Sequence, residues 1–158
     1  MFFEIAQYRL EIDVVKTKQF YKNADFVSKS CSCDGCLNFE KAVATLPPLV
    51  ITFFSNLGID MKKVCECYVD FSYDDGTLLY GGFYHVCGTL LYGESAWKKI
   101  NENISCWDDE TAFHISPDFY VSFQKDVALL EKDFPLPVIQ LDFSARIPWV
   151  LEKSNTYR

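Results

Sequence analysis

The stretch Ile139-Gln140-Leu141-Asp142-Phe143-Ser144-Ala145-Arg146-Ile147 alternates apolar and polar side chains without interruption. A period of two places the apolar residues on one face of a β-strand and the polar residues on the other. Pro148 follows and ends the strand, because proline has no amide hydrogen to donate to a sheet. The same kind of pattern predicts further strands over residues 8–14, 110–115 and 119–123.

The middle of the chain predicts a long β-hairpin. Residues 64–73 and 77–92 both read as strands, and they flank Asp74-Asp75-Gly76, a turn signal between strands. Gly81-Gly82 and Gly88 lie inside the second strand, which indicates bulges or a close approach of neighbouring backbone. In this hairpin, positions whose numbers sum to about 150 lie opposite one another.

Helices are expected mainly between these strands. Residues 37–46 carry apolar side chains at helical spacing, and Asp34 is close enough to serve as the N-cap. Pro47-Pro48 ends this helix and begins a second one that extends to Leu57, with Gly58 as a left-handed C-terminal residue. A third short helix is predicted over 96–104. The order of elements indicates one α+β domain, residues 1–158, with a mainly antiparallel β-sheet or sandwich and two short helices after a cysteine cluster.

Composition restricts the function classes. The chain has 158 residues and a formal net charge of −7, which argues against nucleic acid or an anionic membrane as partner and would suit a basic protein partner. The start, Met1 to Ile5, has no basic region of a secretory signal. The uncharged runs 42–59 and 77–93 contain prolines or glycines and polar residues. We therefore interpret them as buried elements of a soluble domain rather than as membrane-spanning helices. These features predict a cytoplasmic protein of unspecified oligomeric state.

Cys31-Ser32-Cys33-Asp34-Gly35-Cys36 is the most strongly marked chemical feature of the sequence. Seven cysteines, an odd number, fit a fully paired disulfide framework poorly. Without an export signal the thiols are expected to be reduced. Three thiols in six residues can converge on a metal ion, and zinc prefers thiolate ligands. A tetrahedral zinc site then needs a fourth ligand from elsewhere in the chain.

The predicted hairpin is the expected source of this fourth ligand. Cys65 and Cys67 share one face of its first strand, and His85 and Cys87 share one face of its second strand. Cys65 and His85 would be cross-strand neighbours, so the predicted metal ligands are Cys31, Cys33, Cys36, His85 and Cys65. These hairpin residues could also form a site of their own, or be core cysteines and a hydrogen-bonded strand histidine.

Other chemistry at the cluster stays open at this point. Cys33-Asp34-Gly35-Cys36 at a helix start can stabilise a thiolate, as in dithiol oxidoreductases, although the strand and long helix of a thioredoxin-like unit are missing. A disulfide and three unligated thiols are the remaining alternatives. The sequence contains no P-loop, no dinucleotide-binding glycine motif and no Gly-x-Ser-x-Gly elbow.

Four motifs together resemble a family of uncharacterised bacterial proteins. They are the Cys-x-Cys-x-x-Cys-x-Asn-aromatic start of a helix (31–39), Leu-Gly-Ile-Asp (57–60), Tyr-Gly-Gly-x-Tyr-His (80–85) and Pro-Trp-Val-Leu (148–151). The resemblance covers most of the chain and implies a coherent domain, but it implies no catalytic residue.

Two function classes follow from the sequence. The first is a non-catalytic, interaction-type protein, such as an immunity or antitoxin-like binder, with a cysteine-rich loop that zinc stabilises. The second is a small thiol- or metal-dependent enzyme centred on Cys33 and Cys36.

Overall fold

The fold is that of a computed structural model, which describes residues 1–157. The strands are β1 (Phe2–Ile5), β2 (Tyr8–Ile12), β3 (Glu66–Ser72), β4 (Leu78–Tyr92), β5 (Trp97–Asn101), β6 (Ile104–Trp107), β7 (Phe113–Ser116), β8 (Phe119–Gln124) and β9 (Val138–Ile147). The α-helices are α1 (Val14–Asn23), α2 (Val27–Ser30), α3 (Asp34–Ala42) and α4 (Pro48–Asn56), and two short 3₁₀ helices cover Val43–Thr45 and Met61–Lys63. The predicted α+β class is therefore confirmed.

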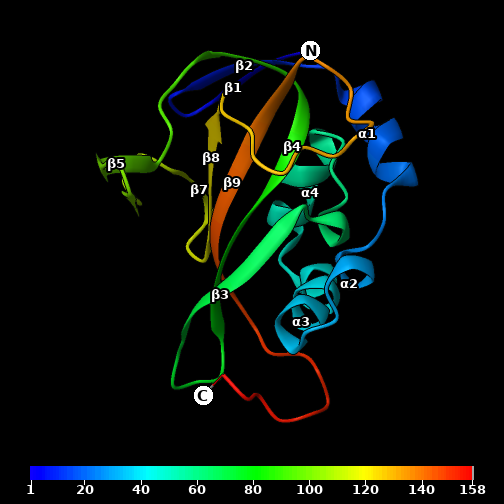
Figure 1. Cartoon of the computed structure of the whole chain (residues 1–158), viewed down its shortest axis with the longest axis vertical. Coiled ribbons are helices and arrows are strands. Elements are labelled where there is room, and N and C mark those ends of the chain that lie inside the picture. Colours follow the sequence, from blue (N-terminus) through cyan, green and yellow to red (C-terminus); the bar gives the residue numbers. More distant parts are fainter. Residues whose placement is uncertain (158) are drawn as a thin grey trace.

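Strand β4 is the central strand of a seven-stranded antiparallel sheet (Figure 1). Six strands follow the order β1-β2-β4-β9-β8-β7, and the seventh, β3, pairs with β4. Strand β4 pairs with β9 along ten residues, from Leu78–Ile147 to Cys87–Val138. On its other edge β4 pairs with β3 near its start and with β2 near its end. The alternating segment 139–147 thus lies in the middle of the sheet, where one apolar face is most deeply buried.

Glycines allow two strands to share one edge of β4. A Cβ atom on Gly82 would lie 2.2 Å from the carbonyl oxygen of Glu66 in β3. A Cβ atom on Gly88 would lie 2.3 Å from the carbonyl oxygen of Glu11 in β2. Any larger residue would push the neighbouring backbone away, so the predicted close approach at these glycines is confirmed.

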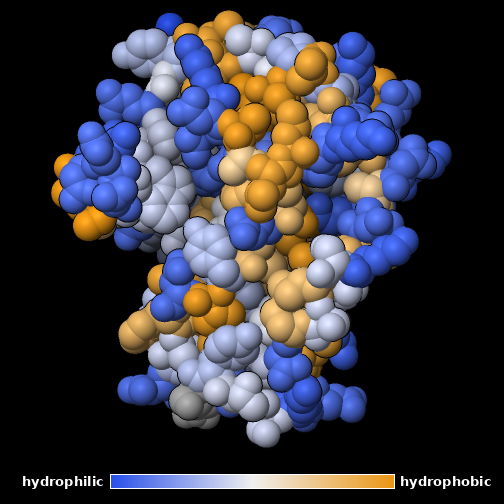
Figure 2. Space-filling model, in the orientation of Figure 1, coloured by the Kyte–Doolittle hydropathy of each residue, from blue (hydrophilic) through white to orange (hydrophobic). Residues whose placement is uncertain are grey.

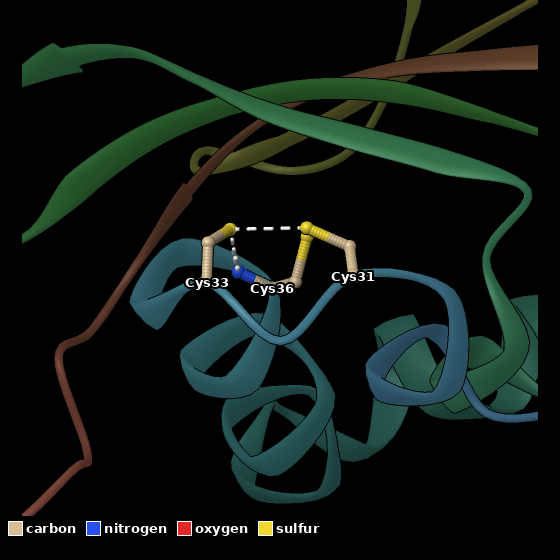
Figure 3. Close-up of side chains that lie close together, drawn as sticks. All are labelled: Cys31, Cys33 and Cys36. Carbon is tan, nitrogen blue, oxygen red and sulfur yellow. Dashed lines mark hydrogen bonds between the residues drawn. The ribbon is translucent and has the colours of Figure 1, made fainter.

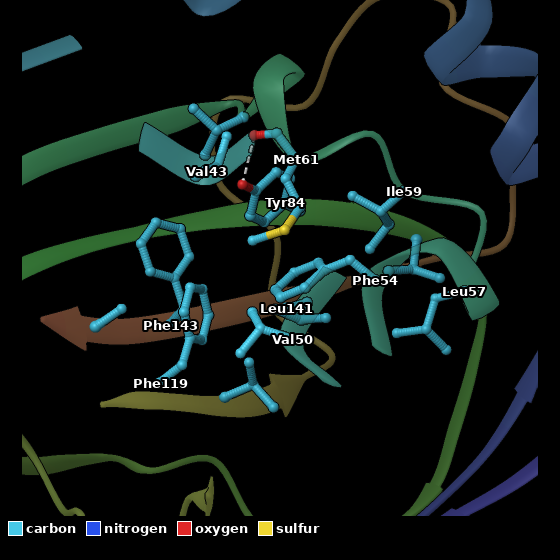
Figure 4. Close-up of a cluster of buried hydrophobic side chains, with 14 of the residues drawn as sticks. Val43, Val50, Phe54, Leu57, Ile59, Met61, Tyr84, Phe119, Leu141 and Phe143 are labelled. Atoms are coloured by element: carbon cyan, nitrogen blue, oxygen red, sulfur yellow. Dashed lines mark hydrogen bonds between the residues drawn. The ribbon is translucent and has the colours of Figure 1, made fainter. Parts of the chain in front are cut away.

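The helices lie together on one side of the sheet (Figure 1), and the core fills the space between the two layers. Phe54 of α4 packs on Tyr84 of β4 with ring centroids 5.2 Å apart, and Phe39 of α3 stacks on Phe143 of β9 at 5.5 Å. The Tyr84 hydroxyl donates a hydrogen bond of 2.7 Å to the carbonyl of Met61 (Figure 4). Aromatic residues therefore dominate the core, because each buries a large apolar area.

The opposite face of the sheet is covered by the loop 125–137 rather than by a helix. The Ala128 amide donates to the Gln140 side chain at 2.8 Å, and Phe134 packs against His85 at 5.8 Å. The loop also leaves apolar side chains exposed at Val127, Leu129, Leu130 and Leu136. Figure 2 shows a hydrophobic area in the upper half of the molecule where Figure 1 shows this loop.

The predicted helix over 96–104 is wrong, because these residues belong to the β5–β6 hairpin. The Asn101 side chain accepts hydrogen bonds from the amides of Asn103 and Ile104 and so closes the turn. Trp97 and Trp107 pair across the two strands with ring centroids 5.4 Å apart. Ile100 and Ile104, whose spacing of four residues fits one face of a helix, are exposed.

The polar segment after the second strand forms a helix that the apolar pattern did not predict. Strand β2 ends at Ile12, and Asp13 caps α1 by accepting from the Lys16 amide at 3.0 Å. Tyr21 is the buried anchor of α1, and its hydroxyl donates to the carbonyl of His85 at 2.7 Å. Helix α1 therefore covers the part of the β4 edge that lies between its pairings with β2 and β3.

None of the helices within residues 1–157 has the length and apolar character needed to cross a membrane. The uncharged run 42–59 contains α4, which has nine residues, and the run 77–93 contains β4.

Candidate metal centre

Three cysteines converge where α2 passes into α3. Cys31 follows the last residue of α2, and Cys33 is the N-cap of α3. The Cys33 sulfur accepts a hydrogen bond from the Cys36 amide at 3.4 Å, which is the role that the sequence assigned to Asp34. That prediction is wrong by one residue, because Asp34 is the first residue of the helix itself. Figure 3 shows the three side chains pointing from this turn towards the sheet.

The sulfur atoms of these cysteines are close enough to share one ion. Cys31 Sγ and Cys33 Sγ are 3.2 Å apart, and all three sulfurs lie within 4.8 Å of one another. Thiolates bound at about 2.3 Å to a tetrahedral zinc ion stand about 3.8 Å apart. The cluster can therefore bind a metal ion after small side-chain movements.

A fourth thiol reaches the cluster from the sheet. Cys67 of β3 places its Sγ 3.9 Å from Cys36 Sγ, close to the spacing of two ligands on one zinc ion. Cys67 lies opposite Gly82 in the hairpin, so its cross-strand neighbour on β4 carries no side chain. Of the hairpin residues that the sequence indicated, Cys67 is the one whose sulfur approaches the cluster, through Cys36; it lies outside the group of three sulfurs that are all within 4.8 Å of one another.

Buried polar contacts hold the first turn of α3 in place against the sheet. The Tyr80 hydroxyl donates to the Gly35 carbonyl at 2.7 Å and accepts from the Asn38 amide at 3.2 Å. On the outer side, Lys153 contacts Asp34 at 3.0 Å. The backbone that carries Cys33 and Cys36 is therefore fixed from β4 and from the C-terminal segment.

The thiols of this cluster differ in how readily they ionise. Hydrogen bonds from the Cys33 amide and from the neighbouring thiols lower the pKa of Cys31. Burial, reinforced by the neighbouring thiols, raises the pKa of Cys36. Burial also raises the pKa of Cys67 to about 12, and Cys33 and Cys31 add to this increase. A bound cation would stabilise all four as thiolates, because it supplies the positive charge that this site lacks.

The other predicted ligands lie elsewhere. Cys65 and His85 are neighbours, as the hairpin register predicts, but they form a separate group with Glu131 rather than joining the cluster at Cys31. The residue numbers of the cross-strand pairs Glu66–Phe83 and Ser72–Leu78 sum to 149 and 150, so the predicted register of about 150 is confirmed. The assignment of Cys65 and His85 as partners of the first cluster is corrected accordingly, since their sulfur and ring atoms face the loop 125–137.

Two cysteines have no part in either group among the described residues. Cys87 is buried, and its backbone amide donates a hydrogen bond of 3.1 Å to the Thr17 hydroxyl of α1. Cys106 is exposed on β6. Sequence reasoning missed Glu131, because it lies in a loop without periodicity, 46 residues after its partner His85.

No protein-family model matches the chain, and no curated protein or solved structure matches it either. The resemblance to uncharacterised bacterial proteins therefore stays a prediction.

Proposed function

We propose that the protein is a non-catalytic, interaction-type protein whose cysteine turn is stabilised by a zinc ion bound to Cys31, Cys33, Cys36 and Cys67. The observation that carries this proposal is the 3.9 Å approach of Cys67 on β3 to Cys36 on α3. It joins two distant parts of the chain at thiols that already converge. Four thiolates complete a tetrahedral structural site without any further ligand.

The interaction role is supported by the surface rather than by the cluster. The net charge of −7 favours a basic protein as partner. Exposed aromatic side chains, such as Phe71 and Tyr92, supply the apolar contacts that interfaces use. In this proposal the metal site fixes the turn at one end of α3, and the acidic surface attracts the partner.

The zinc site is tested by elemental analysis of purified protein together with the Cys67→Ser variant. We expect about one zinc ion at this site per chain and a loss of affinity of at least tenfold in Cys67→Ser, because a thiolate ligand is removed. Cys106→Ser is the matched control, since Cys106 is exposed and remote in the fold. Unchanged zinc affinity in Cys67→Ser would refute the four-thiolate site.

A second candidate function is thiol chemistry, and the structure favours Cys31 for it rather than Cys36. The hydrogen bonds that lower the pKa of Cys31 favour its ionised form, which is the form in which a thiol acts as a nucleophile. Metal-free protein would then alkylate fastest at Cys31 at neutral pH. If peptide mapping shows that every cysteine alkylates slowly, the thiol-enzyme alternative is excluded.

A further inference from the structure

A second group of metal-ligating side chains lies at the start of β3, away from the cysteine turn. Cys65 immediately precedes β3, His85 lies on β4, and Glu131 lies in the loop 125–137. One ligand atom from each lies within 4.8 Å of the other two. Three separate parts of the chain therefore bring a sulfur, a nitrogen and an oxygen donor to one place.

His85 is the central member of this group and has unfilled bonding capacity. Its side chain is fully buried (0% exposed), and its Nδ1 atom contacts a Glu131 carboxylate oxygen at 2.6 Å. Its Nε2 atom is buried and has no hydrogen-bond partner in the described part of the chain. Native proteins rarely leave a buried polar atom without a partner, so this ring is the kind of group that a ligand completes.

The donor set is suited to a metal ion rather than to a nucleophilic triad. The Cys65 thiol donates to the Leu129 carbonyl at 3.4 Å instead of to His85, which is the behaviour of a protonated thiol. A nucleophilic cysteine needs the opposite, a histidine that takes its proton. A metal site needs no such base, because a thiol that coordinates a cation loses its proton.

From these contacts we infer that Cys65, His85 and Glu131 form a second metal site that binds a divalent transition metal such as zinc. Mixed sulfur, nitrogen and oxygen ligands are typical of zinc, and three protein ligands leave the fourth position open. Cys65 and Glu131 also line a cleft of about 410 Å³ together with Phe26, Lys63 and Asp133. Water or a donor group of a small molecule in this cleft can take the open position.

The site would also fasten the loop 125–137 to the sheet. Glu131 is the only one of the three ligands in this loop, and its side chain is 28% exposed. Metal binding would add a bond between this carboxylate and strands β3 and β4. The metal would then hold this loop, with its exposed apolar side chains, more firmly against the sheet.

Cobalt(II) titration tests this inference, because cobalt reports a thiolate ligand by a near-ultraviolet charge-transfer band. The Cys31→Ser/Cys33→Ser variant disables the first site, and we expect it still to bind one cobalt ion per chain through Cys65. Adding Glu131→Gln should weaken this remaining binding at least tenfold. Asp133→Asn is the matched control, because Asp133 is exposed on the same loop and contributes no ligand atom to the group.

The outcomes separate the two sites. If Cys31→Ser/Cys33→Ser binds no cobalt, or if Glu131→Gln and Asp133→Asn behave alike in that background, the second site is refuted. Circular dichroism of each variant confirms that it is folded, and Cys65→Ser gives an independent ligand deletion. If Glu131→Gln in an otherwise wild-type chain abolishes all cobalt binding, the second site is supported and the four-thiolate site is contradicted.

Discussion

Asp142 is a buried carboxylate on the central strand β9, and its surroundings determine how the stability of the protein depends on pH. The side chain is 2% exposed and accepts hydrogen bonds from Gln140 at 2.7 Å and Gln124 at 2.6 Å. Burial nevertheless raises its pKa to about 6. Since the folded pKa exceeds the unfolded one, the stability linked to this group is fully present below about pH 4 and is lost as pH rises through about 6.

Asp142→Asn should therefore stabilise the protein at pH 7.5. A pKa near 6 against about 4 in the unfolded chain corresponds to a cost of about 3 kcal/mol for the ionised residue, and we expect a gain of about 1–2 kcal/mol in the free energy of unfolding. The Gln124 side chain can turn so that its oxygen accepts a hydrogen bond from the amide group that the substitution introduces. Urea unfolding at pH 7.5 and pH 4 measures the gain, which should vanish at the lower pH.

The exposed residue Asp118 provides the control for this substitution. Asp118→Asn should change the free energy of unfolding by less than about 0.5 kcal/mol at either pH. A stabilisation by Asp142→Asn that is equal at both pH values would contradict the assigned cause, because it would not follow ionisation.

Asn38 connects the cysteine-bearing helix to two other parts of the chain. Its side-chain amide donates to Tyr80 at 3.2 Å and to the Pro148 carbonyl at 3.1 Å, and its oxygen accepts from the Val150 amide at 2.7 Å. Asn38→Ala removes these three hydrogen bonds and leaves the Pro148 carbonyl and the Val150 amide without this partner, so we expect a loss of about 2–4 kcal/mol in the free energy of unfolding, measured by urea denaturation. Tyr80→Phe, which removes only the hydroxyl, should cost about half as much.

Tyr80→Phe also tests how the cysteine turn is held. The Tyr80 hydroxyl donates to the Gly35 carbonyl, between Cys33 and Cys36. Zinc affinity should therefore fall in Tyr80→Phe as well as stability. Unchanged zinc affinity in a folded Tyr80→Phe protein would show that the turn does not depend on this contact.

At the scale of elements, the β5–β6 hairpin stands apart from the main sheet. Its two strands pair only with each other among residues 1–157, and Figure 1 shows β5 projecting from the side of the molecule. Trp107→Ala removes the Trp97 contact and should increase amide hydrogen exchange in this hairpin. We expect the global free energy of unfolding to fall by less than about 1 kcal/mol, because the hairpin opens locally.

Exchange measured residue by residue by NMR checks this prediction. The amides of β4 and β9 provide the internal control, since these strands form the centre of the sheet. Faster exchange across β4 and β9 in Trp107→Ala would mean that the hairpin belongs to the main cooperative unit.

Whether an element could be predicted from the sequence depended on how its side chains are buried. Strand β9 could be predicted because one of its faces is buried along its whole length, so that the pattern is continuous. Helix α1 could not, because it buries only Thr17 and Tyr21 fully and has no apolar stripe. The β5–β6 hairpin was mistaken for a helix because its exposed Ile100 and Ile104 imitate one.

The candidate site was predictable in part. Cys31, Cys33 and Cys36 are close together in the sequence, so their convergence follows from a single turn. Cys67 belongs to the hairpin that the cysteine spacing indicated, but register alone could not tell which of its residues faces α3. That choice depends on how β3 lies against the helix layer, which is a property of tertiary packing.

At the scale of the whole molecule, the C-terminal segment 148–157 joins the cysteine turn to the β3–β4 turn. Lys153 contacts Asp34 of α3, and the Asn155 side chain donates to the Gly76 carbonyl at 3.0 Å. A Cβ atom on Gly35 would lie 2.8 Å from the Tyr157 hydroxyl, so this tyrosine covers the turn closely. The segment therefore shields Cys36, which is buried, from solvent.

Removing residues 152–158 should make the cysteine turn open more easily in metal-free protein. Loss of these contacts is expected to speed alkylation of Cys36 by about tenfold, which corresponds to about 1.4 kcal/mol in the opening equilibrium. Cys87 is the internal control, because it is buried near α1 and does not depend on the C-terminal segment. Mass spectrometry of alkylated peptides gives both rates from one sample. Equal acceleration at Cys36 and Cys87 would indicate global destabilisation, and no acceleration at either would show that the turn is held from β4 alone.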